Sequence, residues 1–404
     1  MSAAQETAAA TYGFDLTDSA FHRDPYPVYR RLREAAPAVL LPYGSWVVTR
    51  FSEVSALLRD ARLRTDFPTD PRWVERHGGP DAPTVADGRH WMLLNEGPDH
   101  RGTRRLFTHF FTPAAVEGHR RRVGSVVGAV LDGLERGAAV DVVADVAEPI
   151  VAASMCELLG LPPAHKERYA AWSATISRMT DPVPGSGVRD QVGAAMERFR
   201  THIEGLARGG GLAGIAAELL DGGRCEAEAR VIVANLVMLA MAGTDTTVSQ
   251  IALAVRALLD GTERPAWALS DPESAERAVP ELARYDGPVQ LVTRRAVEPL
   301  RVGDAEIPAG AKVMLCLGAA NRDERRYRSA HRLDPHRPDV AALPFGDGAH
   351  YCLGARMGRM VVGTTLAELF RRYPSLRPAH PWDRLDWRPS VVARRPETLP
   401  AVLA

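Results

Sequence analysis

The sequence is poor in cysteine, and its cysteines form no pattern that would hold a zinc ion or a redox-active pair. Cys156, Cys225, Cys316 and Cys352 lie far apart in the 404 residues, and no two of them form a CxxC pair. Zinc sites and redox dithiols usually bring their cysteines together at such short spacings, so both are disfavoured. Unpaired cysteines fit a reducing compartment.

Other absences narrow the function further. The 50 basic residues balance 50 acidic residues, so no global field would attract nucleic acid or an anionic membrane surface. Residues 1–17 lack the basic start and the apolar run of a secretory signal. There is no HExxH motif or Walker loop, and the GxGxxG match at residues 209–214 follows a helical stretch instead of a strand. We therefore expect a cytoplasmic protein that binds neither nucleic acid nor membrane.

What the sequence does contain is helical periodicity over most of its length. A proline-rich turn at residues 23–27 leads into an amphipathic helix over 28–35, and runs of strand-forming residues occur at 46–49 and 312–317. Glycines and prolines at 181–187 and 209–211 separate helical stretches and are too short to link domains. The sequence predicts one mainly α domain with a small β region over residues 1–404, of which about 1–20 form a flexible extension.

One predicted helix, Glu226 to Leu259, has apolar residues on all sides, which is typical of a helix buried through the centre of a large domain. A membrane span is the alternative. Its continuously apolar part is too short, and Asp245 with three threonines falls in its middle, which is costly in hydrocarbon. We therefore expect a buried core helix.

Residues 345–354, FGDGAHYCLG, place Cys352 just before a helical run from Ala355 to Phe370. A cysteine at a helix N-terminus meets the positive end of the helix dipole, which lowers its pKa and favours the metal-binding thiolate. A lone cysteine is more often an inert core residue. A cysteine nucleophile would need a base histidine and an orienting partner close in space, so nucleophilic catalysis ranks second.

This decapeptide resembles the haem-binding signature FxxGxHxCxG of the cytochrome P450 family, and the resemblance extends from about Asp24 to the C-terminus. It implies the cytochrome P450 fold and a haem b whose iron is bound by Cys352. Without a CxxCH motif, the haem should be held noncovalently. The resemblance implies further haem contacts from the same loop, namely Phe345, Gly346, His350 and Gly354.

The buried helix contains AGTDTT at residues 242–247, which resembles the family's AGx[DE]TT motif on the oxygen-binding side of the haem. Splitting O2 requires protons in a site that otherwise excludes water, so an acid and a hydroxyl are needed beside the iron. The resemblance makes Asp245 the proton relay and Thr246 the residue that holds the reduced oxygen. Gly243 should contact the haem, leave room for oxygen and open the helix locally.

Two further sets of residues are implied by the resemblance. Glu281 and Arg284 match the family's ExxR helix, with Arg332 as the third member that holds the following loop beneath the haem. Taken alone, such a spacing predicts only a weak surface ion pair. The haem propionates need cations, for which the candidates are His100, Arg104, Arg294 and His350. The chain departs from the family at Glu96-Gly97, where an Asp-Pro pair is common.

The function implied is a monooxygenase that uses O2, with electrons from NAD(P)H delivered by ferredoxin reductase and ferredoxin. Its substrate should be a hydrophobic or aromatic small molecule of specialised metabolism. The expected substrate contacts are Trp73, Trp91, Met92, Leu239, Ala242, Val289, Gln290, Leu291, Val292, Val391 and Val392. A basic face for ferredoxin could comprise Arg120, Arg121, Arg122, Arg356 and Arg359. Two alternatives remain, namely oxidative ring closure or aryl coupling by the same haem, and a haem sensor or carrier without turnover.

Overall fold

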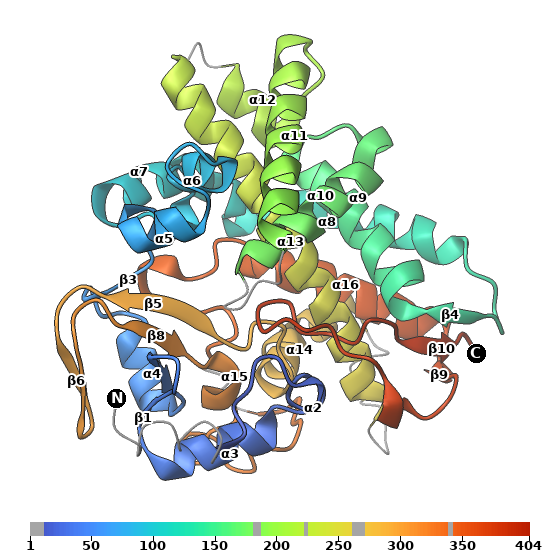
Figure 1. Cartoon of the computed structure of the whole chain (residues 1–404). Coiled ribbons are helices and arrows are strands. Elements are labelled where there is room, and N and C mark those ends of the chain that lie inside the picture. Colours follow the sequence, from blue (N-terminus) through green and yellow to red (C-terminus); the bar gives the residue numbers. More distant parts are fainter. Residues whose placement is uncertain (1–11, 181–186, 222–224, 261–270, 338–341) are drawn as a thin grey trace.

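The computed structural model describes residues 12–180, 187–221, 225–260, 271–337 and 342–404. Helices dominate it, and strands form a small part (Figure 1). The predicted mainly α fold with a small β region is confirmed. The longer helices are α3 (Tyr26–Ala35), α7 (Gly97–Thr108), α8 (Pro113–Asp132), α9 (Glu148–Leu159), α10 (Lys166–Ser177), α11 (Val188–Arg208), α13 (Glu226–Leu259), α14 (Pro272–Tyr285) and α16 (Ala355–Arg372).

The remaining elements are short. The short helices are α2 (Ser19–Arg23), α4 (Phe51–Leu57), α5 (Pro71–Arg76), α6 (Pro83–Gly88), α12 (Gly214–Leu220) and α15 (Leu317–Ala320). The strands are β1 (Ala38–Leu40), β2 (Ser45–Val48), β3 (Leu63–Arg64), β4 (Ala139–Asp141), β5 (Val292–Ala296), β6 (Leu300–Val302), β7 (Ala305–Ile307), β8 (Lys312–Leu315), β9 (Arg377–Pro378) and β10 (Pro400–Val402).

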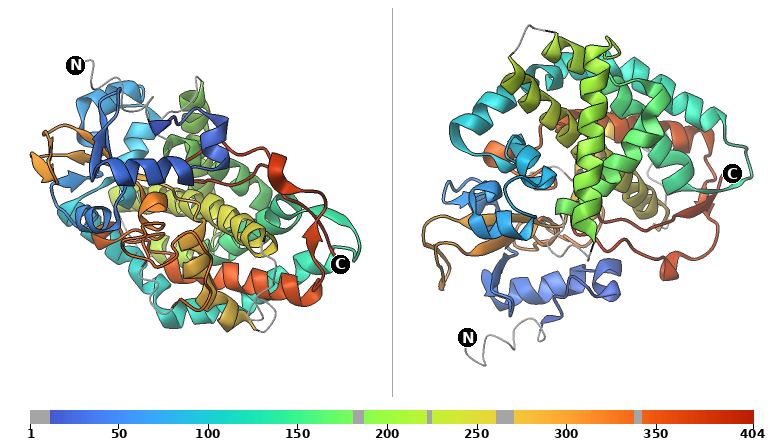
Figure 2. Two further views of the ribbon diagram at one scale, coloured as in Figure 1. Left: turned by 90° about the horizontal axis from the view of Figure 1, so that it is seen from below. Right: turned by 45° about the horizontal axis from the view of Figure 1, so that its top comes forward.

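The strands form three small sheets, of which two lie on one side of the helices and the third on the other (Figure 1). Five strands pair in the order β1-β2-β8-β5-β3, in which only the β2/β8 pair is parallel. Strands β6 and β7 form a separate hairpin, and β4, β10 and β9 form the third sheet. Figures 1 and 2 show the first two sheets near α3, α4 and α5, and the third near the C-terminus. The strands predicted at 46–49 and 312–317 correspond to β2 and β8, although residue 317 already begins α15.

Helix α13 has the bounds expected from the sequence and is the centre of the helical part. It packs against α9, α10, α11 and α16, and its apolar side chains belong to the largest hydrophobic core. Its first turn is capped because Glu228 accepts a hydrogen bond from the backbone N–H of Cys225. α13 is long and apolar enough to cross a membrane, but 67% of its most apolar window is buried inside the protein. This burial is what a core helix requires.

Helices α14 and α16 pack side by side and bring two sequence motifs close to α13. Asp271 caps the start of α14 by accepting a hydrogen bond from the Ser274 N–H, and Pro272 occupies the first turn. α16 begins directly after the cysteine loop, as predicted. Its inward side is mostly apolar down to Phe370, so burial of this face fixes its direction against the core.

Two predicted segments lie partly outside the described residues. Of the expected N-terminal extension, residues 1–11 are not described, whereas Phe14 is buried and its ring lies 5.3 Å from that of Phe21. The described end of this segment therefore packs on the domain. Of the predicted break at 181–187, residues 181–186 are not described. The glycines at 209–211 follow the end of α11, as expected.

Candidate active site

The cysteine loop is shaped by its backbone. The Cys352 N–H donates to the Phe345 carbonyl over 2.9 Å, which closes the loop just before α16. Gly346 and Gly348 have φ values of 72° and 70°, a region that side chains other than glycine rarely adopt. A Cβ on Gly348 would also lie 2.7 Å from the Leu58 carbonyl oxygen. These contacts fix the position of Cys352 without using its sulfur.

The Cys352 side chain is surrounded by protein atoms and is nevertheless accessible, so a bound group can reach the sulfur. Burial raises the pKa of the Cys352 thiol, and the Gly354 N–H and the nearby Arg104 oppose this only in part. The expectation that the helix terminus would give a lowered pKa is therefore wrong for the free thiol, because desolvation is the larger effect. A coordinated metal ion removes the proton from such a thiol.

Arg294 on β5 is a buried cation without a carboxylate. It is 8% exposed, and the one hydrogen bond that its guanidinium makes among the described residues goes to the Thr293 carbonyl, at 3.0 Å. Burial lowers the pKa of Arg294 to about 10, although the negative charge of Glu96 acts to raise it. A buried guanidinium without a counter-ion is strongly unfavourable. This position therefore fits an anionic group supplied by a ligand.

His100 and His350 have different surroundings, although their rings lie 4.4 Å apart. The His100 Nε2 is buried without a partner among the described residues, and burial with the charges of His350 and Arg104 lowers the pKa of His100 to about 4. His350 instead has its Nε2 3.2 Å from the Glu96 carboxylate. Burial would raise the pKa of Glu96, but hydrogen bonds from His350 and Thr65 outweigh it and lower the pKa to about 2.

Two of the expected propionate contacts, His350 and Arg104, have partners within the protein. The His350 Nε2 is taken by Glu96, a carboxylate of the protein itself, which stands where the family commonly has Asp-Pro. Arg104 on α7 donates from Nη2 to the Tyr351 carbonyl over 2.7 Å, so it holds the residue just before Cys352. Of the four candidates His350 has a carboxylate partner, whereas Arg104 and Arg294 each donate to a backbone carbonyl and the His100 Nε2 has no partner in the described chain.

A stripe of partly exposed positions runs along the middle of the otherwise buried α13. It comprises Leu239, Ala242, Gly243, Thr246 and Thr247, at the spacing of one helix face. Protein therefore does not cover this face. The Thr246 hydroxyl donates its hydrogen to the Ala242 carbonyl over 2.7 Å, which leaves the oxygen lone pairs of Thr246 as acceptors on the stripe.

The local opening of the helix that was expected at Gly243 is absent. α13 is continuous from Glu226 to Leu259, so the helix does not open at this glycine. A Cβ on Gly243 would lie 2.8 Å from the Met155 Sδ, which means that the glycine allows α9 to pack closely on α13. Gly243 therefore lets α9 pack closely on α13, although the residue itself is partly exposed on the stripe.

Asp245 is buried and directed away from the stripe. Its Oδ1 accepts a hydrogen bond from the Arg388 Nη1 at 2.6 Å, and its Oδ2 accepts one from the Ser177 hydroxyl at 2.5 Å. Ser177 is the last residue of α10, and Arg388 belongs to the segment between η9 (Trp382–Arg384) and β10. No motif in the sequence points to either partner, since they lie 68 and 143 residues from the acid.

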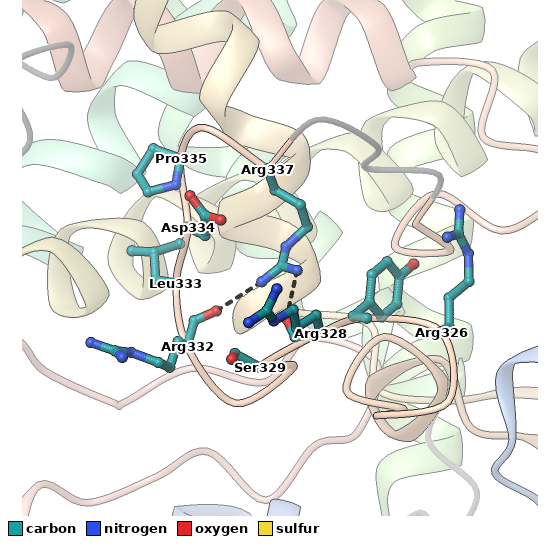
Figure 3. Close-up of a pocket in the computed structure, with 9 residues that line it drawn as sticks. Arg326, Arg328, Ser329, Arg332, Leu333, Asp334, Pro335 and Arg337 are labelled. Carbon is teal, nitrogen blue, oxygen red and sulfur yellow. Dashed lines mark hydrogen bonds between the residues drawn. The ribbon is translucent and has the colours of Figure 1, made fainter.

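The ExxR pair forms as expected, with a different third member. Arg284 makes two hydrogen bonds to Glu281, of 2.6 and 2.8 Å, and both side chains are fully buried. The third arginine is Arg337, whose Nε lies 3.2 Å from the Glu281 carboxylate. The prediction of Arg332 was wrong for its side chain, because Arg332 contributes its carbonyl, which accepts from Arg284 over 2.8 Å. Figure 3 shows the Arg332 side chain pointing away from Arg337.

A hollow of about 610 Å³ lies at this loop (Figure 3). It is lined by Arg326, Tyr327, Arg328, Ser329, Arg332, Leu333, Asp334, Pro335 and Arg337. Polar atoms make up much of its wall, and no residue expected to contact haem, oxygen or substrate lines it. The hollow is therefore a feature of the supporting loop and not the substrate site.

The expected substrate contacts divide into two groups. Those with accessible surface are Trp73, Leu239, Ala242, Val289, Val292 and Val392. Those buried in the core are Trp91, Met92, Gln290, Leu291 and Val391. The buried group has no exposed surface in this structure, so contact of these five residues with a substrate stays a prediction.

The reasons are local. Trp91 is 0% exposed and packs in the main core with Met92. The Gln290 amide donates to the Gly287 carbonyl. A Cβ on Gly318 would lie 2.1 Å from the Gln290 Oε1, so Gln290 packs directly against this glycine. A short apolar run shows that a segment is close to the core, but not which of its residues points into an adjoining space.

The comparisons with known proteins agree with this geometry. A family model described as cytochrome P450 matches residues 273–399, which include the ExxR pair and the cysteine loop. The 6-deoxyerythronolide B hydroxylase of Saccharopolyspora erythraea is 32% identical, with 96% of this chain and 98% of that protein covered. The chain belongs to the cytochrome P450 family.

Other members of the cytochrome P450 family are equally similar over their whole length. The vitamin D(3) 25-hydroxylase of Pseudonocardia autotrophica is 31% identical, with 98% of both chains covered. The crystal structure of CalO2 matches with a TM-score of 0.88 and 30% identity, covering 97% of this chain and 98% of that one. This cytochrome P450 is thus a haem-dependent monooxygenase with the family fold, as the sequence predicted.

The residues of this cytochrome P450 fit a haem. Cys352 is accessible, Arg294 is a buried cation without a carboxylate, and the His100 Nε2 has no partner in the described chain. A thiolate-bound iron and two propionates would satisfy these three groups. Cys352 would hold the iron, and Arg294 with His100 would hold the propionates, with Arg104 and His350 as the further candidates.

Arg294 offers a direct test of the propionate site. Arg294→Gln is expected to release haem about tenfold faster, since a hydrogen bond to a charged group contributes about 1.5–3 kcal/mol. Transfer of haem to excess apomyoglobin measures the rate. Arg295→Gln is the matched control, because Arg295 is the next residue of β5 and pairs with Asp66 instead. Equal release from both variants would contradict the assignment.

Proposed function

We propose that this cytochrome P450 hydroxylates a hydrophobic or aromatic small molecule of specialised metabolism, with a noncovalent haem b ligated by Cys352. The observation that carries the proposal is the accessible stripe on α13, which places the Thr246 hydroxyl among Leu239, Ala242 and Gly243. The accessible side chains expected at the substrate are mostly aliphatic, which favours an apolar ligand. The relative that acts on 6-deoxyerythronolide B supports a biosynthetic role.

When bound, the haem supplies the oxidising chemistry, and the residues of the chain control it. Cys352 would hold the iron and supply it with the electron density of a thiolate. Thr246, whose own hydrogen is used by the Ala242 carbonyl, would accept a hydrogen bond from a donor that lies against the stripe. Asp245 exchanges protons between the interior and the solvent. The apolar side chains exclude water, which would otherwise compete for the protons.

Replacing Thr246 by alanine tests this role. Thr246→Ala is expected to release most of the electrons from NAD(P)H as hydrogen peroxide, because the alanine cannot hold the protonated oxygen. Thr244→Ala is the matched control, since Thr244 donates to the Ala240 carbonyl over 2.7 Å in the same way but is buried off the stripe. Peroxide formed per NAD(P)H oxidised, with a surrogate ferredoxin and reductase, is the measurement. Equal yields from both variants would favour a sensor or carrier.

Oxidative ring closure or aryl coupling uses the same haem and the same protons. Hydroxylation adds one oxygen atom to the product, whereas ring closure or coupling removes hydrogen without adding oxygen. We propose hydroxylation because both full-length relatives named above are hydroxylases. A substrate can be found by the shift that it causes in the haem absorption spectrum. The mass of its product then distinguishes the two reactions.

We further propose that electrons come from NAD(P)H through a ferredoxin that docks on basic residues beside the cysteine loop, in the cytoplasm. The five arginines first considered are not equivalent. Arg120 and Arg122 are already paired with glutamates, and Arg359 is partly buried. Arg121 and Arg356 are exposed and form no ion pair within the described part of the chain. The docking face we propose therefore centres on Arg356, in the first turn of α16.

Helix α7 adds two arginines that the sequence did not single out. Arg101 and Arg105 are exposed on the same face as Arg104, which contacts Tyr351 of the cysteine loop. Charge reversal in Arg101→Glu/Arg356→Glu is expected to slow haem reduction by an acidic ferredoxin about tenfold at low salt. Stopped-flow reduction measures this rate.

Arg377→Glu provides the control for the ferredoxin experiment. Arg377 is exposed on β9, beyond the opposite end of α16 from Cys352. The Arg377→Glu substitution changes the net charge as much as each substitution in the double variant does. It should leave the rate of haem reduction unchanged. If the α7/α16 variant is reduced as fast as the control at every salt concentration, the docking face lies elsewhere.

A further inference from the structure

Two histidines and a tyrosine meet where helices α10 and α11 pack against each other and on α13 (Figure 1). His165 directly precedes α10, Tyr169 lies in the first turn of this helix, and His202 lies near the C-terminal end of α11. None of the three belongs to the residues expected to contact haem, oxygen or substrate. The two histidines are 37 residues apart, so no short spacing in the sequence points to the cluster.

The polar atoms of the cluster form a nearly equilateral triangle. The His165 Nδ1 lies 3.2 Å from the His202 Nε2 and 3.3 Å from the Tyr169 hydroxyl oxygen. The third side, between the His202 Nε2 and the Tyr169 oxygen, is 3.0 Å. Zinc sites are almost always tetrahedral with bonds of about 2.0 Å to nitrogen and oxygen, which places neighbouring ligand atoms about 3.3 Å apart. The triangle is therefore close to one face of such a tetrahedron.

Hydrogen bonds within the cluster cannot account for all three contacts at once. A neutral imidazole nitrogen either donates or accepts, and a hydroxyl has a single hydrogen to donate. If His165 donates to Tyr169 and Tyr169 donates to His202, the two nitrogens are left 3.2 Å apart with no hydrogen between them. If one nitrogen donates to the other, the Tyr169 hydrogen has no acceptor in the cluster. A cation, in contrast, can bond to all three atoms.

The two imidazoles are accessible, whereas the tyrosine is held in place. His165 and His202 are half-buried. Tyr169 is 4% exposed, and its ring stacks on that of Phe199 at 5.3 Å. Burial, together with the positive charges of His165 and Arg168, lowers the pKa of His202, so its imidazole is mostly neutral at pH 7. Neutral imidazole is the form that binds metal ions.

We propose that His165, His202 and Tyr169 bind a divalent transition-metal ion of the Zn²⁺ class, with a water molecule as the fourth ligand. Imidazole nitrogen suits Zn²⁺, Cu²⁺ and Ni²⁺, whereas Ca²⁺ and Mg²⁺ take oxygen ligands. The ion would tie the start of α10 to the end of α11, so that both helices keep a fixed position against α13. The proposal is independent of the proposed reaction, because it uses none of the residues assigned to haem, oxygen or substrate.

Isothermal titration of the haem-loaded protein, prepared without an affinity tag, measures binding of Zn²⁺. One ion is expected to bind per chain, and Mg²⁺ should not compete for the site. His165→Ala and His202→Ala should each weaken binding by more than about tenfold, which loss of an outer partner of a metal ligand already costs. Tyr169→Phe should weaken it less, because burial raises the pKa of Tyr169 to about 12 and a protonated oxygen is the weaker ligand.

His109→Ala is the matched control for the titration. His109 is an exposed histidine whose Nε2 lies 3.2 Å from the Glu218 carboxylate, so it could also attract an ion. The control is expected to keep the full affinity for Zn²⁺. Unchanged affinity in both His165→Ala and His202→Ala, or an equal loss in His109→Ala, overturns the proposal.

X-ray absorption at the zinc edge identifies the ligands in the unmodified protein, so it does not depend on whether the variants fold. The spectrum should show nitrogen and oxygen neighbours at about 2.0 Å, with the outer scattering of two imidazole rings. A sulfur neighbour at about 2.3 Å would place the ion at a cysteine. A shell of oxygen alone would place it on surface carboxylates. Either of these two results overturns the proposal.

Urea unfolding tests whether the ion ties the two helices in the folded chain. An ion that binds the folded form alone stabilises it, so Zn²⁺ should raise the urea midpoint of the haem-loaded protein. The double variant His165→Ala/His202→Ala should show no rise. A rise of the same size in the double variant would mean that Zn²⁺ stabilises the protein from another position.

Discussion

Replacing Cys352 by serine is expected to abolish oxygen-dependent turnover while leaving the fold intact. The loop is held by the Cys352 N–H bond to Phe345, by its two glycines, and by the Arg104 contact with Tyr351, none of which uses the sulfur. A serine hydroxyl keeps its proton and cannot supply the electron density of a thiolate. The variant should therefore keep its helical circular dichroism and lose its activity.

The other cysteines provide the comparison. Cys225 is exposed at the start of α13, where serine is a favourable capping residue, so Cys225→Ser should keep full turnover and stability. Haem content, circular dichroism and O2 consumption are measured on both variants. Normal turnover by Cys352→Ser would show that another group binds the iron.

Glu281→Ala is expected to have the largest effect on stability. Glu281 neutralises Arg284 and Arg337, and its side chain is 1% exposed, so its removal leaves two guanidinium groups without their carboxylate. Breaking a buried ion pair from one side costs about 3–5 kcal/mol. Because Arg284 also holds the carbonyls of Asn321, Ala330 and Arg332, the loop that leads to the cysteine should be disordered and haem should be lost.

An exposed glutamate of the same helix is the matched control for Glu281. Glu273 on α14 pairs with Arg277 at 3.5 Å, and its side chain is 79% exposed. Glu273→Ala should cost no more than about 0.5 kcal/mol, as is usual for surface pairs within a helix. Urea unfolding gives both values. A similar small loss for both variants would mean that the buried trio does not hold the loop.

The sequence predicts the fold and the centre of the site because both depend on local patterns. The cysteine loop, α13 and the ExxR pair each lie within one short segment, where glycine positions, apolar periodicity and i,i+3 spacing carry the information. Arg332 and Arg337 could not be distinguished in this way, since both are arginines of one irregular loop. Only the path of the backbone decides which of them places its side chain at Glu281.

Contacts between distant segments could not be predicted. Ser177 and Arg388 reach Asp245 from α10 and from the C-terminal segment, and neither lies in a recognisable motif. Glu96 departs from the family pattern, but only the structure shows that it is the partner of His350. Burial of Trp91 likewise follows from its packing in the main hydrophobic core, which its apolar neighbours in the sequence do not specify.

The most direct test of the account is the absorption spectrum of the reduced protein with carbon monoxide. A thiolate on the proximal side of the iron gives a strongly red-shifted Soret band, which is expected for the purified protein. The shift should be absent from any Cys352→Ser protein that retains haem. A spectrum like that of globin, in which a histidine binds the iron, would contradict the assignment of Cys352 and every role derived from it.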